Sequence, residues 1–235
     1  MVGLKRSVPI SPGRHANGRD IEIPPLGLGG TLTLPAEARG LVVFAHGSGS
    51  SRFSPRNVAV AAALNDAGFA TLLFDLLTPA EESDRANVFD IRLLADRLVH
   101  AIRWIDQDPE LSRLPLGLFG ASTGAAAALV AAAQLGERVG AVVSRGGRPD
   151  LAGAMLPLVR APTLLIVGGN DEVVILLNEQ ALARLSAPKA LRIVPHATHL
   201  FSEPGALEAV SRYAIEWFSL HLGHEAAKVA PSRSS

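Results

Sequence analysis

A serine in the middle of the chain has the setting of a catalytic nucleophile. Residues 120–124 read Gly-Ala-Ser-Thr-Gly, a G-x-S-x-G pattern between a strand-like apolar run and an Ala-rich helical segment. A strand that turns this sharply into a helix leaves no room for side chains two residues from the serine, which explains both glycines. The turn also puts Ser122 at a helix N-terminus, where free N–H groups favour a developing negative charge. The pattern predicts Ser122 as a nucleophile; the alternative is an ordinary Gly/Ser turn.

Such a serine requires a base later in the chain, and an acid that orients the base. The acid candidate is Asp171, in a Gly-Gly-Asn-Asp-Glu loop directly after the strand-like run 163–167. A carboxylate there can hold an imidazole in the correct tautomer. Asp171 could instead cap the helix that follows it. Glu172 and Asp150 are weaker acid candidates.

The base candidate is His199, in the loop that follows the strand-like run 191–194. His199 precedes a Leu-Phe pair that can anchor the loop against the core. His196 comes directly after the run and competes for the same role. Because Ser122 and Asp171 both require a base in this part of the chain, His199 is the favoured candidate.

Two backbone N–H groups must bind the oxyanion that forms when the serine attacks a carbonyl. Thr123, directly after the nucleophile, is expected to supply one. The second is expected from Ser48, in the loop 46–51 of sequence His-Gly-Ser-Gly-Ser-Ser, whose small residues allow close approach of the backbone. A loop of this composition could also cradle a phosphate, but it lacks the Gly-Lys-Ser/Thr ending of a nucleotide-binding loop. His46 is interpreted as a buried histidine that ties loops together.

Three further residues are candidate substrate contacts. Ser50 and Arg52 follow the oxyanion loop, and Arg145 follows the strand-like run 141–144. Either arginine could meet a substrate carboxylate. The structural alternative, which is favoured, is that they pair with acidic side chains. The acidic candidates for that pairing are Asp75, Asp150 and Glu82.

The elements that must position these residues alternate in type. Short β-rich runs occur at 21–23, 30–34, 41–45, 70–74, 116–119, 141–144, 163–167 and 191–194. Segments with helical spacing occur at 57–67, 90–104, 123–135, 172–185 and 204–221. The alternation predicts the α/β class: a doubly wound, mostly parallel sheet with helices on both faces and the first two strands as an antiparallel edge. Ligands of such sheets bind beyond the carboxyl ends of the strands, where the candidates above lie.

Domain organisation follows from length and spacing. The 235 residues suit a single domain, with ends at 1–13 and 225–235 that we expect to be flexible. The short stretch between Ser144 and Thr163 has room for one helix and loops, so no large cap domain is expected there. The stretch 76–89 is the other place for a small flap over the site.

Composition excludes several classes. The formal net charge is zero and the basic residues are scattered, so neither nucleic acid nor an anionic membrane surface is an expected partner. With no cysteine, disulfides, thiolate metal sites and a cysteine nucleophile are excluded. No signal-peptide pattern or membrane-spanning run is present, which favours a cytoplasmic location. The expected state is a monomer or homodimer that acts on a small-molecule ester.

These motifs, in this order, resemble the dienelactone-hydrolase type of the α/β-hydrolase superfamily, over roughly Ile21 to His221. The resemblance rests on four stretches, 46–49, 120–124, 169–171 and 198–201. It implies a compact hydrolase without a cap, a metal or an organic cofactor. Dienelactone hydrolases proper use a cysteine nucleophile, whereas this chain has Ser122, so the lactone substrate is not carried over. The serine points to activity like that of a carboxylesterase.

Other uses of the same groups stay open at this stage. The triad could serve as a lactonase or thioesterase, transfer an acyl group to an acceptor other than water, or support a haloperoxidase-like side reaction. The scaffold could also belong to a binding protein without catalytic activity.

Overall fold

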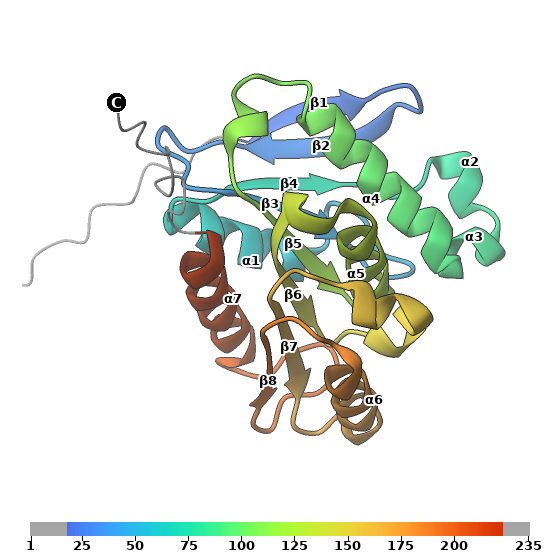
Figure 1. Ribbon diagram of the computed structural model, residues 1–235, viewed down its shortest axis with the longest axis vertical. Helices are drawn as coiled ribbons and strands as arrows, with labels where there is room; N and C mark the ends of the chain where they lie inside the picture. Colours follow the sequence, from blue (N-terminus) through green and yellow to red (C-terminus); the bar gives the residue numbers. More distant parts are fainter. Residues whose placement is uncertain (1–17, 223–235) are drawn as a thin grey trace, which may run out of the picture.

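The computed structural model describes residues 18–222 (Figure 1), so the ends predicted to be flexible, 1–13 and 225–235, lie outside the described residues. The strands form one eight-stranded sheet in the order β1-β2-β4-β3-β5-β6-β7-β8. Their bounds are β1 (Arg19–Ile23), β2 (Leu28–Thr33), β3 (Leu41–Ala45), β4 (Ala70–Phe74), β5 (Leu116–Ala121), β6 (Val139–Arg145), β7 (Thr163–Gly168) and β8 (Lys189–Val194).

Strand direction within the sheet agrees with the prediction from the sequence. The pairs β1–β2 and β2–β4 are antiparallel, and the remaining neighbours from β4 to β8 are parallel. The two N-terminal strands therefore form the antiparallel edge. In the parallel part, every carboxyl end faces the same edge of the sheet.

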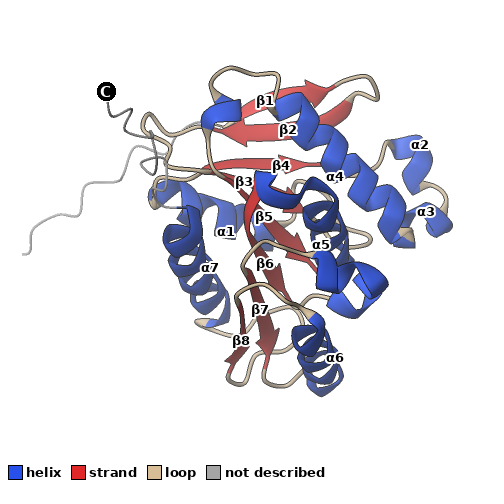
Figure 2. Cartoon of the chain, viewed as in Figure 1, coloured by secondary structure: helices blue, strands red, loops and turns tan. Residues whose placement is uncertain are grey.

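Helices cover both faces of the sheet (Figures 1 and 2). One face carries α1 (Pro55–Asp66) and α7 (Ala206–Leu222), whose buried residues pack in the same core cluster. The other face carries α4 (Ile91–Ile105), α5 (Thr123–Leu135) and α6 (Glu172–Arg184). These contacts confirm the predicted doubly wound arrangement.

Two hydrophobic clusters, one on each face, explain why the central strands are apolar along their whole length. In β3, Leu41 and Val43 pack toward α4 and α5, whereas Val42 and Phe44 pack toward α1 and α7. Neighbouring side chains of a strand point to opposite faces, so a strand covered on both sides must be apolar at every position. The burial of all five residues of β3 follows from this.

The connections between the parallel strands carry helices, and the longest, from β4 to β5, carries α2 (Pro79–Glu82), α3 (Arg85–Phe89), α4 and the 3-10 turn η1 (Leu111–Arg113). Between β6 and β7 lies the 3-10 segment η3 (Pro149–Leu158), which packs on α5 and α6 and leaves no large cap domain. Another 3-10 turn is η2 (Gly136–Arg138). The two short helices after β4, α2 and α3, lie where the sequence predicts a flap.

The sequence did not predict α2 and α3 as helices, although their caps are visible in it. The Thr78 hydroxyl accepts a hydrogen bond from the Glu81 N–H, and the Glu81 carboxylate accepts one from the Thr78 N–H, a capping box. Asp84 caps α3 by accepting from the Ala86 N–H. No helix within residues 18–222 is long and apolar enough to cross a membrane.

Candidate active site

Ser122 occupies a sharp turn between β5 and α5. Its backbone angles, φ 52° and ψ −123°, lie in a region that non-glycine residues rarely adopt. A Cβ on Gly120 would lie 2.4 Å from the Ala125 Cα, and a Cβ on Gly124 would lie 2.2 Å from the Ala45 carbonyl oxygen. Both glycines are therefore required by close backbone contacts, as the sequence predicts.

The end of β6 and the segment after it hold the backbone of Ser122 through two hydrogen bonds. The Ser122 N–H donates to the carbonyl oxygen of Arg145 at 3.3 Å, and the Arg148 N–H donates to the carbonyl oxygen of Ser122 at 3.1 Å. These bonds fix the strained turn in place. They also bring residues 145–148 next to Ser122.

Asp171 and His199 meet at the same edge of the sheet. The Nδ1 of His199 lies 2.7 Å from the Oδ2 of Asp171. Asp171 stands at the N-cap position of α6, but its side chain makes no capping hydrogen bond. The carboxylate therefore contacts the imidazole through Nδ1 and does not cap the helix.

The two histidines that the sequence offers as a base, His196 and His199, differ in their surroundings. His196 is exposed and has a left-handed backbone, φ 62°. The His199 side chain is 40% exposed, and the Asp171 side chain is 17% exposed. A partly exposed imidazole on a largely buried carboxylate fits the orientation that acid-base catalysis needs.

Gly146 brings the loop of His199 close to the turn of Ser122. Its φ is 50°, and a Cβ there would lie 3.2 Å from the His199 carbonyl oxygen and 3.6 Å from the His199 Cε1. Within residues 18–222, the Ser122 hydroxyl forms no hydrogen bond with His199. Catalytic hydrogen bonds are often long in a free enzyme and tighten when substrate binds.

The loop after β3 also lies close to Ser122. A Cβ on Gly47 would lie 2.9 Å from the Ser122 Cβ. The next N–H, that of Ser48, donates to the Thr123 hydroxyl at 2.9 Å. The two predicted oxyanion residues are thus in direct contact, and the Ser48 amide already has an acceptor.

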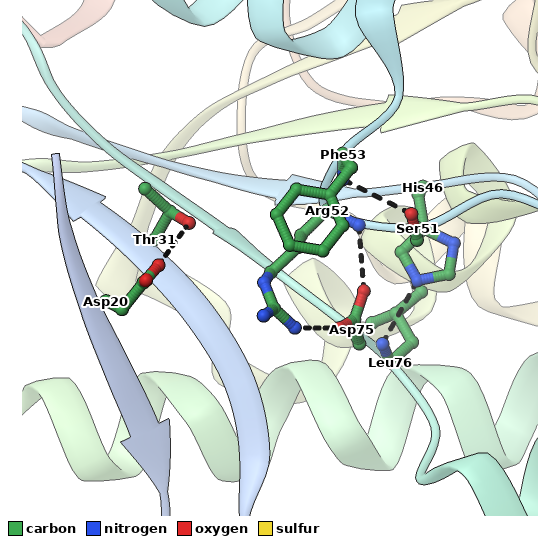
Figure 3. A network of polar contacts seen from close by, with 8 residues as sticks. All are labelled: Asp20, Thr31, His46, Ser51, Arg52, Phe53, Asp75 and Leu76. Carbon is green, nitrogen blue, oxygen red and sulfur yellow. Dashed lines mark hydrogen bonds and ion pairs between the residues drawn. The ribbon is translucent and has the colours of Figure 1, made fainter.

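Polar contacts anchor this loop to the end of β4 (Figure 3). The His46 Nε2 accepts from the Leu76 N–H at 3.1 Å, and its Nδ1 lies 3.0 Å from the Gly47 carbonyl oxygen. The Arg52 guanidinium pairs with one carboxylate oxygen of Asp75. The other oxygen accepts a hydrogen bond from the backbone N–H of Arg52 at 2.8 Å. His46 therefore has the structural role predicted for it, and Arg52 makes the structural pairing that was the alternative to a substrate contact.

Among the residues that the structure describes, Arg145 does not form the ion pair with an acidic side chain that the sequence favoured. The residue is 7% exposed, and its guanidinium donates to the Asn57 Oδ1 at 3.3 Å and lies 5.9 Å from the Phe201 ring centre. Burial, together with the nearby charge of Arg56, lowers the pKa of Arg145 to about 10. Within residues 18–222 no carboxylate pairs with it.

The acids expected to pair with Arg145 have other positions. Asp75 binds Arg52, and Asp150 binds Arg148 at 2.8 Å. Glu82 lies in the flap. The sequence could not reveal the contact with Asn57, because it depends on how α1 crosses the sheet.

A cavity of about 540 Å³ opens beside the oxyanion loop. Its lining comes from the segment between β3 and α1 and from the flap. The lining residues are Gly49, Ser50, Ser51, Phe53, Ser54, Pro55, Glu82 and Val88. Of the three predicted substrate contacts, Ser50 lines this cavity, whereas Arg52 and Arg145 do not. Within residues 18–222 no three His, Asp or Glu side chains group as metal ligands would.

Comparison with known proteins gives a family and a fold. The family model described as "Dienelactone hydrolase family" matches residues 28–218. The crystal structure of a dienelactone hydrolase from Anabaena variabilis is 54% identical, with a TM-score of 0.83 over 87% of this chain and 99% of that one. An esterase from Pyrococcus furiosus, 18% identical, has a TM-score of 0.70 over 94% of this chain and 100% of that one, a likeness of fold alone.

Two curated relatives carry a different name. They are proteins from two strains of Mycobacterium tuberculosis, provisionally named phosphoribosyl transferases, each 61% identical over 198 residues. The match covers 84% of this chain and 45% of theirs, so the chain spans just under half their length.

Proposed function

Because the chain belongs to the dienelactone hydrolase family, and thus to the α/β-hydrolase fold, we propose that it is a serine hydrolase that cleaves carboxylic esters of small substrates through an acyl-enzyme on Ser122. The observation that carries the proposal is the 2.7 Å hydrogen bond between His199 and Asp171, at the sheet edge where Ser122 turns outward. A serine in place of the cysteine of dienelactone hydrolases proper supports an ester rather than a dienelactone as substrate.

The first half of the reaction forms the acyl-enzyme. The Ser122 Oγ attacks the ester carbonyl carbon while the His199 Nε2 takes the hydroxyl proton. The carbonyl electrons move onto oxygen, and the N–H groups of Thr123 and Ser48 bind that oxyanion. The Ser48 amide exchanges the Thr123 hydroxyl for the oxyanion as its acceptor. The C–O bond to the alcohol then breaks, and the imidazolium protonates the departing oxygen.

The second half repeats the steps with water. The His199 Nε2 removes a proton from water, the hydroxide attacks the acyl carbon, and the Ser122 oxygen leaves with the proton returned by His199. Asp171 holds the ring tautomer throughout and stabilises the imidazolium. The 40% exposure of the His199 side chain supports water as the acceptor, since a closed site would favour acyl transfer to a bound alcohol.

The name of the curated relatives does not bear on this chemistry. The region shared with this chain is under half of each of those proteins. Phosphoribosyl transfer is therefore not proposed for this chain.

Turnover of short-chain p-nitrophenyl esters tests the proposal, together with labelling by a fluorophosphonate probe. Ser122→Ala should abolish both, and Ser211→Ala, on α7 far along the chain, is the matched control that should keep both. Wild-type turnover by Ser122→Ala would reject the nucleophile. Folded wild-type protein that neither turns over esters nor reacts with the probe would favour a binding protein.

A further inference from the structure

The cavity beside the oxyanion loop has a definite chemical character. Three serines and Phe53 line it from the segment before α1, and Glu82 and Val88 line it from the flap. Among the described lining residues, Glu82 is the ionisable one. Phe53 is 63% exposed, and the Arg52 guanidinium lies 4.3 Å from its ring centre.

This cavity shares lining residues with a hollow that reaches the loop beside Ser122. Gly49, Glu82 and Val88 also line a small hollow under the oxyanion loop, together with Gly47 and Ser48. Gly47 is the residue whose Cα packs against the Ser122 side chain. A substrate with its carbonyl at Ser122 and Ser48 can therefore extend one end into the cavity.

The flap leaves one of its two neighbouring carboxylates without a cationic partner. Glu81 pairs with Arg97 and closes the capping box with Thr78, and these contacts lower its pKa, the Thr78 N–H most strongly. Glu82 forms no ion pair within residues 18–222. Because the capping box fixes the helix that carries it, the Glu82 charge is held at the cavity wall.

Nearby arginines do not supply a positive lining. Arg52 is neutralised by Asp75 and Arg148 by Asp150, while Arg145 is buried beside Phe201 and Asn57. Arg56 follows Pro55 in α1 but is not among the lining residues. The cavity therefore presents hydroxyl groups, an aromatic face and a negative charge.

We propose that this cavity is a subsite for the part of an ester that carries a hydroxyl or cationic group, and that Glu82 makes the enzyme discriminate against carboxylate-bearing esters. The inference rests on the proposed ester hydrolysis and adds its substrate class. The Glu82 carboxylate accepts hydrogen bonds from hydroxyl groups, attracts a cation and repels an anion. The serine hydroxyls add donors and acceptors, and Phe53 offers a ring face to a C–H surface or a cation.

The test compares matched esters whose terminal group is hydroxyl, trimethylammonium, carboxylate or methyl. In one series the acyl chain carries that group, and in a second series the alcohol carries it. In at least one series, wild-type kcat/KM should be higher for the cationic and hydroxyl esters than for the methyl ester, and lowest for the carboxylate ester. Because Glu82 is exposed and partly screened, its charge should change the cation-to-carboxylate ratio by about three- to tenfold. Glu82→Gln should compress that ratio, Glu82→Lys should invert it, and added salt should shrink it.

Failure of this inference can be told apart from failure of the proposed function. The methyl ester measures hydrolysis without charge, so the rates of each variant on the charged esters are divided by its own rate on the methyl ester. Glu179→Gln on α6 is the matched control and should leave all ratios unchanged. An unchanged ratio in Glu82→Lys, with methyl-ester turnover intact, overturns the subsite. If no ester is hydrolysed, equilibrium binding of the same esters to wild type and Glu82→Lys decides the subsite independently.

Discussion

The backbone N–H of Ser48 donates a 2.9 Å hydrogen bond to the side-chain hydroxyl of Thr123. The two residues are the proposed oxyanion donors, so a side chain of one occupies the amide of the other before substrate arrives. When the oxyanion replaces that hydroxyl as acceptor, the hydroxyl is free to turn its own proton toward the same oxygen. Thr123 can thus contribute its side chain as well as its N–H.

Thr123→Val should lower kcat by about tenfold with little change in KM, because a donor used in the transition state is lost while both amides remain. Thr123→Ser keeps the hydroxyl and should retain most of the activity. Steady-state kinetics on a short-chain ester measures both variants. Faster turnover by Thr123→Val would mean that the hydroxyl only blocks the Ser48 amide.

Gly146→Ala should impair catalysis more than stability. The new Cβ would lie 3.2 Å from the His199 carbonyl oxygen, so the loop of the base must shift by a few tenths of an ångström. We expect kcat to fall by about 10-fold to 100-fold, since misplaced catalytic groups lose rate steeply. Positive φ alone should cost about 1 kcal/mol of stability.

Gly136→Ala provides the matched control for that variant. Gly136 has a similar φ, 56°, but no atom lies within 4 Å of a Cβ placed there. It should lose about 1 kcal/mol in a denaturation experiment, from its positive φ alone, and keep its activity. Equal activity losses in the two variants would contradict the role given to Gly146.

The capping box of the flap predicts a pH dependence. The Thr78 N–H and the Arg97 guanidinium lower the pKa of Glu81 in the folded protein. A carboxyl group with a depressed folded pKa contributes stability above its ordinary pKa and loses it as the pH falls through the folded value. Wild type should therefore exceed Glu81→Gln in thermal stability at pH 7, and the gap should close toward pH 3. Glu82→Gln, which loses no ion pair, is the control; a gap that is constant with pH would contradict the assignment.

Arg145 is expected to reduce stability rather than support it. Burial and Arg56 lower its folded pKa to about 10, which is below the ordinary value, so its charge is disfavoured in the folded state. Arg145→Met keeps the length, removes that burial cost, and leaves the Asn57 amide oxygen without its donor at about 1 kcal/mol. The variant should be more stable than wild type at pH 7, because leaving a buried charge without a counter-ion costs several kcal/mol.

The sign of that difference can be followed with pH. Below pH 10 the guanidinium is charged in both states, so the advantage of Arg145→Met should be constant from pH 7 to 9. Above about pH 10 the folded wild type releases its proton first, so the advantage should shrink. Urea unfolding at each pH measures it. A less stable Arg145→Met at pH 7 would mean that an anion neutralises the site.

The fold and the chemical groups of the site could be predicted because each rests on a local pattern. Strands such as Leu41–Ala45 are apolar at every position, and the glycines around Ser122 are required by one sharp turn. Both signals lie within a few consecutive residues. The position of Ser122, Asp171 and His199 at one edge then follows from the parallel sheet, since each comes after the carboxyl end of a strand.

Contacts between elements far apart in the chain were beyond the same reasoning. The hydrogen bond of Arg145 to Asn57 spans 88 residues and depends on where α1 begins relative to β6. The hydrogen bond of Ser48 to Thr123 likewise depends on how two turns meet. The sequence predicted an acidic partner for Arg145 from its charge alone. In the structure Arg145 is buried and contacts Asn57 and Phe201 instead.

The flap is stabilised by contacts of its own: the capping box, the Asp84 cap, and the Asn87 amide, which donates to the Glu81 carbonyl oxygen at 3.0 Å. Apart from the Arg97 pairing, these contacts lie within residues 78–89. Substitutions in the flap should therefore leave the turn of Ser122 and the imidazole of His199 in place. Related proteins can therefore differ in substrate preference while they keep the same proposed catalytic residues. The flap is thus the natural place to engineer a new substrate preference.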